Sequence, residues 1–175
     1  RTLMSRGDIY LLFVERGLQL LKTGGLLSYI MPNKWTKVMY GKELRQLFLE
    51  YELTSMVDFC DYQIFSDATT YTCIIEMCKR ESNGTINISS LSDVKPSTLA
   101  EDIENSKEIF PAKEMDNGIW ITSSLDNFKK IKKLKEGMKG LGDILSQESC
   151  RGLLTGLSKA FNISDLIEIK FFSFC

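Results

Sequence analysis

The sequence predicts an α/β fold in which helices alternate with the strands of one sheet. Apolar residues recur at helical spacing over residues 8–24, with Asp8 as the expected N-cap and Gly24 as the expected stop. Residues 26–31 then form a short apolar run between a glycine and a proline, which is typical of a strand buried on both faces. A helix that leads into a buried strand indicates a parallel sheet.

The next elements along the chain continue this alternation. Helical apolar spacing over 44–48 marks a second helix, and residues 53–59 give another strand. Residues 69–78 are rich in β-branched and aromatic types, which favours a further strand. The dipeptide 83–84 is Asn-Gly, a hairpin turn signal, and it leads into an expected strand over 85–91.

A change in composition divides the chain into three predicted parts. Residues 1–92 form the first domain, which ends where proline, serine and acidic residues begin. Residues 93–148 form a connecting region, in which 125–138 carry an apolar helical stripe with lysines on the opposite face. Residues 149–175 begin a second domain that mixes turn and apolar residues.

Composition excludes several functional classes. Lys and Arg total 22 against 23 Asp and Glu, so net charge argues neither for nor against a nucleic-acid partner. With no histidine and five cysteines that form no Cys-x-x-Cys pair, zinc-finger spacing and histidine catalysis are excluded and no metal site is expected. Reduced thiols of a cytoplasmic protein are expected. No apolar run is long enough to span a membrane, and the first residue, Arg1, predicts that the chain begins inside a longer protein.

Two loops are the expected place for function. In an open α/β sheet, ligands bind beyond the carboxyl ends of the parallel strands. That rule selects residues 32–35, after the first strand, and residues 62–67, after the second. If the two strands are parallel, both loops open on the same edge. Asp58, at the end of the second strand, has no partner at a useful spacing and is not an acid-base or metal candidate.

The order of these motifs resembles a known family of enzymes. The motifs that carry the resemblance lie within 8–80 and include Ile30-Met31-Pro32-Asn33-Lys34-Trp35, Val57-Asp58-Phe59 and Phe65-Ser66-Asp67-Ala68-Thr69-Thr70-Tyr71. They look like the stretch that follows the Asn-Pro-Pro-Tyr motif of gamma-class adenine-N6 DNA methyltransferases, most of all the type IIG restriction-modification enzymes. Residues 149–163 resemble the opening of a TaqI-like C-terminal specificity domain, although Ser158 stands where that family has Asn.

The resemblance implies a fold, and it implies which functional motifs lie in this chain and which lie elsewhere. It implies the C-terminal half of a Rossmann-like class I methyltransferase sheet with an antiparallel last strand, followed by the start of a second α+β domain. Residues 1–92 are then the C-terminal part of the catalytic domain, and 149–175 begin the DNA specificity domain. Because the S-adenosylmethionine loop and the catalytic tetrapeptide are not in this sequence, no catalytic set is complete here. They are expected in a missing N-terminal half, and the chain alone is expected to be inactive and to bind no cofactor.

Phe65 is the residue to which the resemblance gives a role in the reaction. It corresponds to the aromatic that stacks on the adenine extruded from double-stranded DNA, and an aromatic face can return about 1–3 kcal/mol of lost base stacking. The alternative is that Phe65 caps the core of the sheet. Asn33 and Lys34 are candidate DNA contacts, with the alternatives that Asn33 closes the turn after the strand and Lys34 is only solvated. Trp35 is either part of the same contact or core.

Further candidate DNA contacts lie later in the chain. Thr155, Gly156 and Lys159 are candidate DNA contacts in a turn, with ordinary hairpin chemistry as the alternative. The lysine face of 125–138 either contacts phosphates or is a solvated exterior. Two other functions remain open: a DNA-binding or specificity module without catalysis, and the remnant of a truncated gene.

Overall fold

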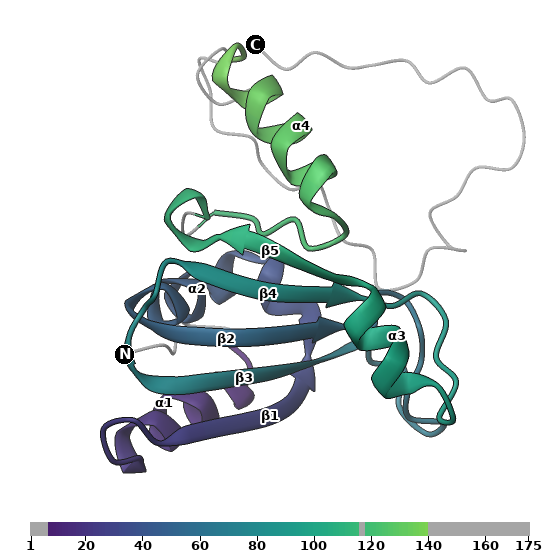
Figure 1. Cartoon of the computed structure of the whole chain (residues 1–175). Coiled ribbons are helices and arrows are strands. Elements are labelled where there is room, and N and C mark those ends of the chain that lie inside the picture. Colours follow the sequence, from purple (N-terminus) through teal and green to yellow (C-terminus); the bar gives the residue numbers. More distant parts are fainter. Residues whose placement is uncertain (1–6, 116–117, 140–175) are drawn as a thin grey trace, which may run out of the picture. The chain divides into compact units, whose positions relative to one another are not determined.

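A mixed sheet organises the part of the chain that the computed structural model describes, residues 7–115 and 118–139 (Figure 1). Its strands lie in the order β1-β3-β2-β4-β5. They are β1 (Leu26–Pro32), β2 (Tyr51–Asp58), β3 (Thr72–Glu81), β4 (Thr85–Ser90) and β5 (Lys107–Pro111). The helices are α1 (Tyr10–Leu20), α2 (Lys42–Glu50), α3 (Leu99–Asn105) and α4 (Leu125–Glu136), and 3₁₀ turns cover Asn33–Thr36, Met39–Gly41 and Ala112–Glu114.

Strand β3 lies between β1 and β2 and runs antiparallel to both. Two strands antiparallel to the same neighbour are parallel to each other, so β1 and β2 end at the same edge of the sheet. Pro32 pairs with Thr72, and Asp58 pairs with Cys73, the next residue along β3. The prediction of contiguous strands over 26–78 with an antiparallel last member is confirmed.

The predicted hairpin at Asn83-Gly84 is wrong in one respect. The turn is present, with Gly84 at a φ of +87°, but β4 pairs in parallel with β2 and not with β3. Both edges of β3 are already hydrogen-bonded, to β1 and to β2, so the chain must cross β2 to find a free edge. Strand β5 then extends the sheet by pairing antiparallel with β4.

Two expectations about the first helix and strand need correction. Asp8 is not the N-cap of α1: Ile9 occupies that position, with no side-chain capping bond. Gly24 does not stop the helix, which ends at Leu20, and instead forms part of the turn into β1 with a φ of +76°. Strand β1 is not buried on both faces, because it is the edge strand of the described sheet and exposes Leu26 and Ile30.

The core is divided between the two faces of the sheet. Helices α1 and α2 cover one face and contribute to the main core, and α3 packs on the other face (Figure 1). Alternation along β2 sends Met56 into the main core and Val57 into the smaller second core. The second core contains Val57, Phe59 and Leu91, with Tyr62, Ile64, Ile74, Val94, Leu99 and Ile103 packed against it.

An aromatic cluster forms part of the main core. The ring of Trp35 lies 4.9 Å from that of Phe48 and 5.3 Å from that of Trp120, both in edge-on geometry. Trp35 is therefore a core residue, as one of the two interpretations of the sequence held. The backbone of Gly41 approaches Trp35 closely, since a Cβ at Gly41 would lie 2.1 Å from the Trp35 carbonyl oxygen.

The predicted connecting region contributes to this core. Besides Trp120, it supplies β5 and α4, and the Phe128 ring of α4 packs 5.8 Å from that of Phe110. Of the predicted apolar stripe, Phe128 is buried but Leu134 and Met138 are exposed. The chain divides into two compact units, Arg1–Glu136 and Gly137–Cys175, and every described helix and strand lies in the first. The domain boundary after residue 92 stays a prediction, and contacts cross it.

Replacing Gly41 by Ala should destabilise the fold by about 1–3 kcal/mol or more, because the new methyl group would collide with the backbone of Trp35, which cannot turn away. Gly17→Ala is a matched control. Its methyl group would meet only the side-chain ends of Leu27 and Tyr29, and Ala favours the helix by up to about 1 kcal/mol. Urea unfolding of both variants measures the difference, and equal stabilities would contradict the close approach.

Candidate functional site

The carboxyl ends of β1 and β2 bring together the two loops that the sequence singles out. Asn33 follows β1 directly, and its backbone N–H donates to the carbonyl of Tyr71, at the end of the loop that follows β2. The backbone N–H of Phe59, where that loop begins, donates to the carbonyl of Thr72. The loop from Phe59 to Tyr71 therefore starts beside β3 and ends beside Asn33, and the expectation that both loops open on one edge is confirmed.

A network of hydrogen bonds centres on the carboxylate of Asp58. Its Oδ1 accepts from Asn33 Nδ2 at 2.9 Å and from the backbone N–H of Cys60 at 3.0 Å. Its Oδ2 accepts from the hydroxyl of Thr122 at 2.7 Å. Asp58 and Thr122 are only 5% and 6% exposed. The network thus joins three segments of the chain at one buried carboxylate.

Asp58 has hydrogen-bond partners that its sequence neighbourhood does not show, while the interpretation that it is not an acid-base or metal residue stays a prediction. Asn33 and Thr122 lie 25 and 64 positions away in the sequence, so no local spacing could reveal them. Thr122 belongs to the network and is a residue that sequence reasoning missed. Its segment is held at a second point by the backbone N–H of Trp120, which donates to the carbonyl of Thr36 at 2.8 Å.

Phe65 lies in the loop after β2 with its ring exposed. The side chain is 46% accessible and belongs to neither apolar core, which is not the placement expected of a residue that caps the sheet. Its neighbours hold the loop instead: Tyr62 and Ile64 pack against the second core, and the Tyr62 hydroxyl donates to the carbonyl of Val94. Gln63 Nε2 donates to the carbonyl of Phe65 itself, at 2.9 Å.

The residues after β1 divide into three environments. Asn33 is half-buried, and its side-chain amide donates to the carbonyl of Cys60 as well as to Asp58. Lys34 is exposed, and Trp35 is buried in the aromatic cluster. Asn33 therefore closes the turn after β1, as one interpretation held, while a DNA contact by Asn33 or Lys34 stays a prediction. Thr155, Gly156 and Lys159 lie outside the described residues.

Thiol chemistry is suppressed at this edge. Burial raises the pKa of the Cys60 thiol, and the negative charges of Asp58 and Asp61 raise it further. Burial also raises the pKa of Cys73, on β3, to about 12. Since the thiolate is the nucleophile, neither cysteine is suited to nucleophilic catalysis at neutral pH.

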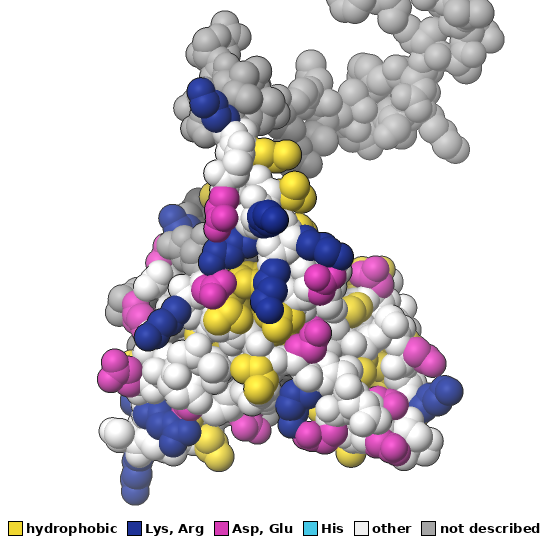
Figure 2. Space-filling model, turned by 45° about the horizontal axis from the view of Figure 1, so that its top comes forward, with side chains coloured by type: hydrophobic (Ala, Val, Ile, Leu, Met, Phe, Trp, Pro, Cys, Tyr) yellow, Lys and Arg dark blue, Asp and Glu magenta, His cyan; other side chains and the backbone are white. Residues whose placement is uncertain are grey.

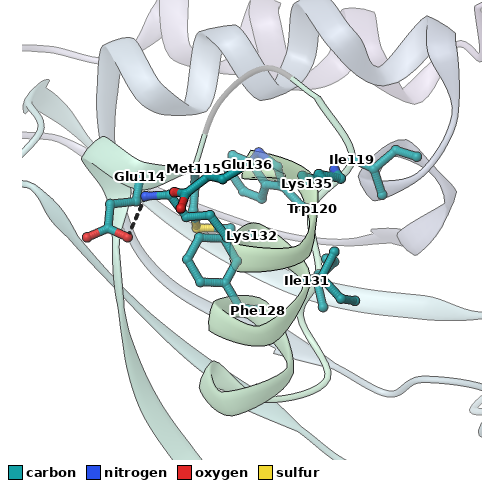
Figure 3. Close-up of a pocket in the computed structure, with 10 residues that line it drawn as sticks. Glu114, Met115, Ile119, Trp120, Phe128, Ile131, Lys132, Lys135 and Glu136 are labelled. Atoms are coloured by element: carbon teal, nitrogen blue, oxygen red, sulfur yellow. Dashed lines mark hydrogen bonds and ion pairs between the residues drawn. The ribbon is translucent and has the colours of Figure 1, made fainter. Parts of the chain in front are cut away.

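A separate pocket of about 270 Å³ lies beside α4 (Figure 3). The helix contributes Phe128, Ile131 and Lys132 to its wall, and Trp120 also lines it. An ion pair of 2.9 Å between Lys132 and Glu114 closes one side of it. The lysine face of α4 is thus partly neutralised, and on the face seen in Figure 2 basic and acidic side chains are intermixed.

The sheet and its edge define a class of fold that solved structures share. The type IIG restriction endonuclease BpuSI aligns with a TM-score of 0.54 and 17% identity over 77% of this chain and 18% of its own. A chain from a type I restriction-modification system aligns with a TM-score of 0.53 and 13% identity, over 78% of this chain and 41% of its own. At these identities the likeness shows the fold alone.

Sequence comparison adds a family. Residues 2–65 match the model of the Eco57I restriction-modification methylase. The chain is 30% identical over 156 residues to the type II restriction enzyme and methyltransferase RM.Eco57I of Escherichia coli, across 88% of this chain. It is 33% identical over 177 residues to the type II methyltransferase M.PaeR7I of Pseudomonas aeruginosa, across 92% of this chain. The chain spans 15% of the length of the first relative and 30% of the second.

These comparisons confirm the coarser part of the predicted resemblance: the chain is similar to type II restriction-modification methyltransferases. The gamma class, the adenine-N6 specificity and the TaqI-like domain stay predictions. Within the described residues, no helix is both long and apolar enough to cross a membrane.

Replacing Asn33 by Asp should destabilise the fold by about 2–4 kcal/mol at neutral pH, because it sets a second carboxylate against Asp58. One carboxyl of the pair would then hold a proton in the folded state that the unfolded chain releases at about pH 4. Stability is lost as the pH rises through the titration of the folded pair, so the deficit should shrink on acidification.

The matched control is Asn33→Ala, which removes the same hydrogen bonds without adding charge and should cost about 1–3 kcal/mol at either pH. Urea unfolding at about pH 5 and about pH 7.5 separates the two variants, because only Asn33→Asp adds a carboxyl that shares a proton with Asp58 in the folded state. A deficit for Asn33→Asp that does not change with pH would contradict the contact with Asp58.

Proposed function

We propose that this chain is part of a restriction-modification DNA methyltransferase that transfers a methyl group from S-adenosylmethionine to adenine N6 in a specific sequence of double-stranded DNA. It would be a gamma-class enzyme of the type IIG kind, in which residues 1–92 belong to the catalytic domain and 149–175 begin the specificity domain. The observation that carries the proposal is the exposed ring of Phe65, held on an anchored loop at the edge where β1 and β2 both end.

The role of Phe65 is to stack on the adenine turned out of the duplex. An extruded base loses its stacking neighbours, and an exposed aromatic face can replace them without reading the base edge. The ring is free to do so because its loop is anchored through Tyr62 and Ile64 and not through the side chain of Phe65. A rigid support with an exposed ring is the arrangement that stacking requires.

The residues of this edge do not fit the cofactor. The polar groups of Asn33, Asp58 and Thr122 donate to and accept from one another, so they offer no set of donors for a methionine carboxylate or a ribose. We therefore propose that cofactor binding and recognition of the adenine amino group belong to an N-terminal half of the same polypeptide. Within the described residues the outer edge of β1 is unpaired, and Leu26 and Ile30 of that strand are exposed, which supports a further strand there.

A DNA-binding module without catalysis is the second candidate. The lysines of α4 favour it, since Lys129, Lys133 and Lys135 extend from one helix. Against it, Lys130 pairs with Asp126 and Lys132 pairs with Glu114, which reduces the positive charge available to phosphates. Methylation by a longer enzyme that contains this chain decides between the two candidates.

The chain alone should bind S-adenosylmethionine no more tightly than millimolar and should methylate no DNA, because the side chains at its edge bond to one another. Isothermal calorimetry with the isolated chain measures the first, and incorporation of labelled methyl groups into DNA measures the second. Micromolar cofactor binding by the isolated chain would contradict this assignment of roles.

Replacing Phe65 by Ala in the longer enzyme should lower base stabilisation by about 1–3 kcal/mol, a loss of up to about a hundredfold in methylation rate. Phe65→Tyr and Phe65→Trp should retain much of the rate, because the contact needs an aromatic face more than one shape. Stability should change by about 0.5 kcal/mol or less, since the ring is exposed.

The two measurements belong side by side: methylation rate on the cognate site, and the free energy of unfolding in urea. Ile64→Ala is the neighbouring control, because that side chain packs against the second core and should lose stability. A Phe65→Ala variant with full methylation and a large stability loss would make the ring a core residue and end its assignment to the base.

A further inference from the structure

The segment Gly118–Thr122 is tied to the same edge of the sheet that carries Phe65. Thr122 donates to Asp58 Oδ2 at 2.7 Å, Trp120 is bound through its backbone to Thr36, and the Thr122 carbonyl accepts from the hydroxyl of Ser90. This segment leads directly into α4, which begins at Leu125. The ends of β2 and β4 and the turn that follows β1 therefore hold it.

The carboxylate of Asp58 divides its bonds between two sides. Oδ1 binds the start of the Phe65 loop, through the N–H of Cys60, and the turn after β1, through Asn33. Oδ2 binds Thr122 in the downstream segment. The loop and the downstream segment each have other anchors, but the carboxylate of Asp58 links the two, so it fixes the place of one relative to the other.

A gain in folding stability does not by itself explain a buried carboxylate at position 58. Removing a carboxylate from water costs several kcal/mol, and apolar side chains of similar volume often replace buried charged groups with no loss of stability. Asp58 is nearly fully buried, and the three donors around its carboxylate are neutral. What the carboxylate supplies that an apolar side chain cannot is direction: two oxygens that fix two segments at set positions.

We propose that Asp58 is a positioning residue, whose carboxylate holds the loop that carries Phe65 in register with the downstream segment Gly118–Thr122. The inference rests on the proposed function, in which Phe65 stacks on the extruded base. Asp58 does not touch DNA or cofactor and acts only through the loop. Its link to Thr122 connects the base-stacking ring to the part of the chain that leads toward the predicted specificity domain.

Thr122 offers the sharpest test because its hydroxyl makes the bond to Oδ2 and leaves the Oδ1 bonds in place. Thr122→Val keeps the shape and removes the hydroxyl, and Thr122→Ser restores it. In the whole chain, hydrogen exchange of the amides of residues 60–71 should be about tenfold faster in Thr122→Val, as expected for one lost hydrogen bond, and near wild type in Thr122→Ser.

A stability control separates positioning from general weakening. Ile86→Val trims a fully buried side chain of β4 and lowers global stability without touching the network. Its exchange at residues 60–71 should stay near the wild-type rate under conditions in which the sheet remains folded. Equal exchange in Thr122→Val and wild type, or equal acceleration in Ile86→Val, would overturn the proposal.

The same variants in the longer methyltransferase give the functional readout. Thr122→Val should lower kcat about tenfold with an unchanged KM for S-adenosylmethionine, because the base and not the cofactor is misplaced, and Thr122→Ser should rescue it. Faster loop exchange with an unaltered kcat would refute the positioning role. A wild-type enzyme that leaves adenine unmethylated would refute the proposed function, while the exchange experiment would still decide whether Asp58 fixes the loop.

Discussion

The double pairing of β3 is the constraint on which the rest of the structure depends. Because β3 is hydrogen-bonded antiparallel to β1 on one side and to β2 on the other, those two strands must run in the same direction and end together. Pro32 and Asp58 pair with the adjacent residues Thr72 and Cys73, which is what allows Asn33 to reach across to the carboxylate. The same pairing leaves β3 no free edge for β4, so β4 pairs with β2 and β5 extends the sheet beyond it.

The alternation of side chains along β2 explains how one loop is held from two faces. Asp58 follows the phase of Met56 and lies on the side of the main core, where Thr36 and Trp120 meet. Phe59 follows the phase of Val57 into the second core, and Tyr62 packs against it. Hydrogen bonds therefore fix the loop after β2 on one face of the sheet, and apolar contacts fix it on the other. The ring of Phe65 lies in the same loop and stays exposed.

Much of this fold follows from local pattern, and the site follows only in part. Helices α1, α2 and α4, strands β1 to β4 and the shared edge are predictable because periodicity and turn residues are local signals, and the antiparallel β3 followed from the family resemblance. Helix α3 and strand β5 were not predicted. The partner of β4 was missed because the Asn-Gly turn reports a change of direction and not which edge is free. The exposure of β1 was missed because an apolar run does not tell an edge strand from a central one. Thr122 was missed because its bond to Asp58 spans 64 positions.

The chemistry left available at this edge limits what the chain can contribute to the proposed reaction on DNA. Asn33, Asp58 and Thr122 use their polar groups on one another, and the thiol of Cys60 is held in its protonated form. An exposed aromatic face remains, and every base has a π-face, so stacking by Phe65 can hold a base without distinguishing adenine from its alternatives. Recognition of the adenine amino group requires hydrogen-bonding groups aimed at the base edge. In the proposed function those groups come from outside this edge, and the proposed part of this chain is to place the base rather than to identify it.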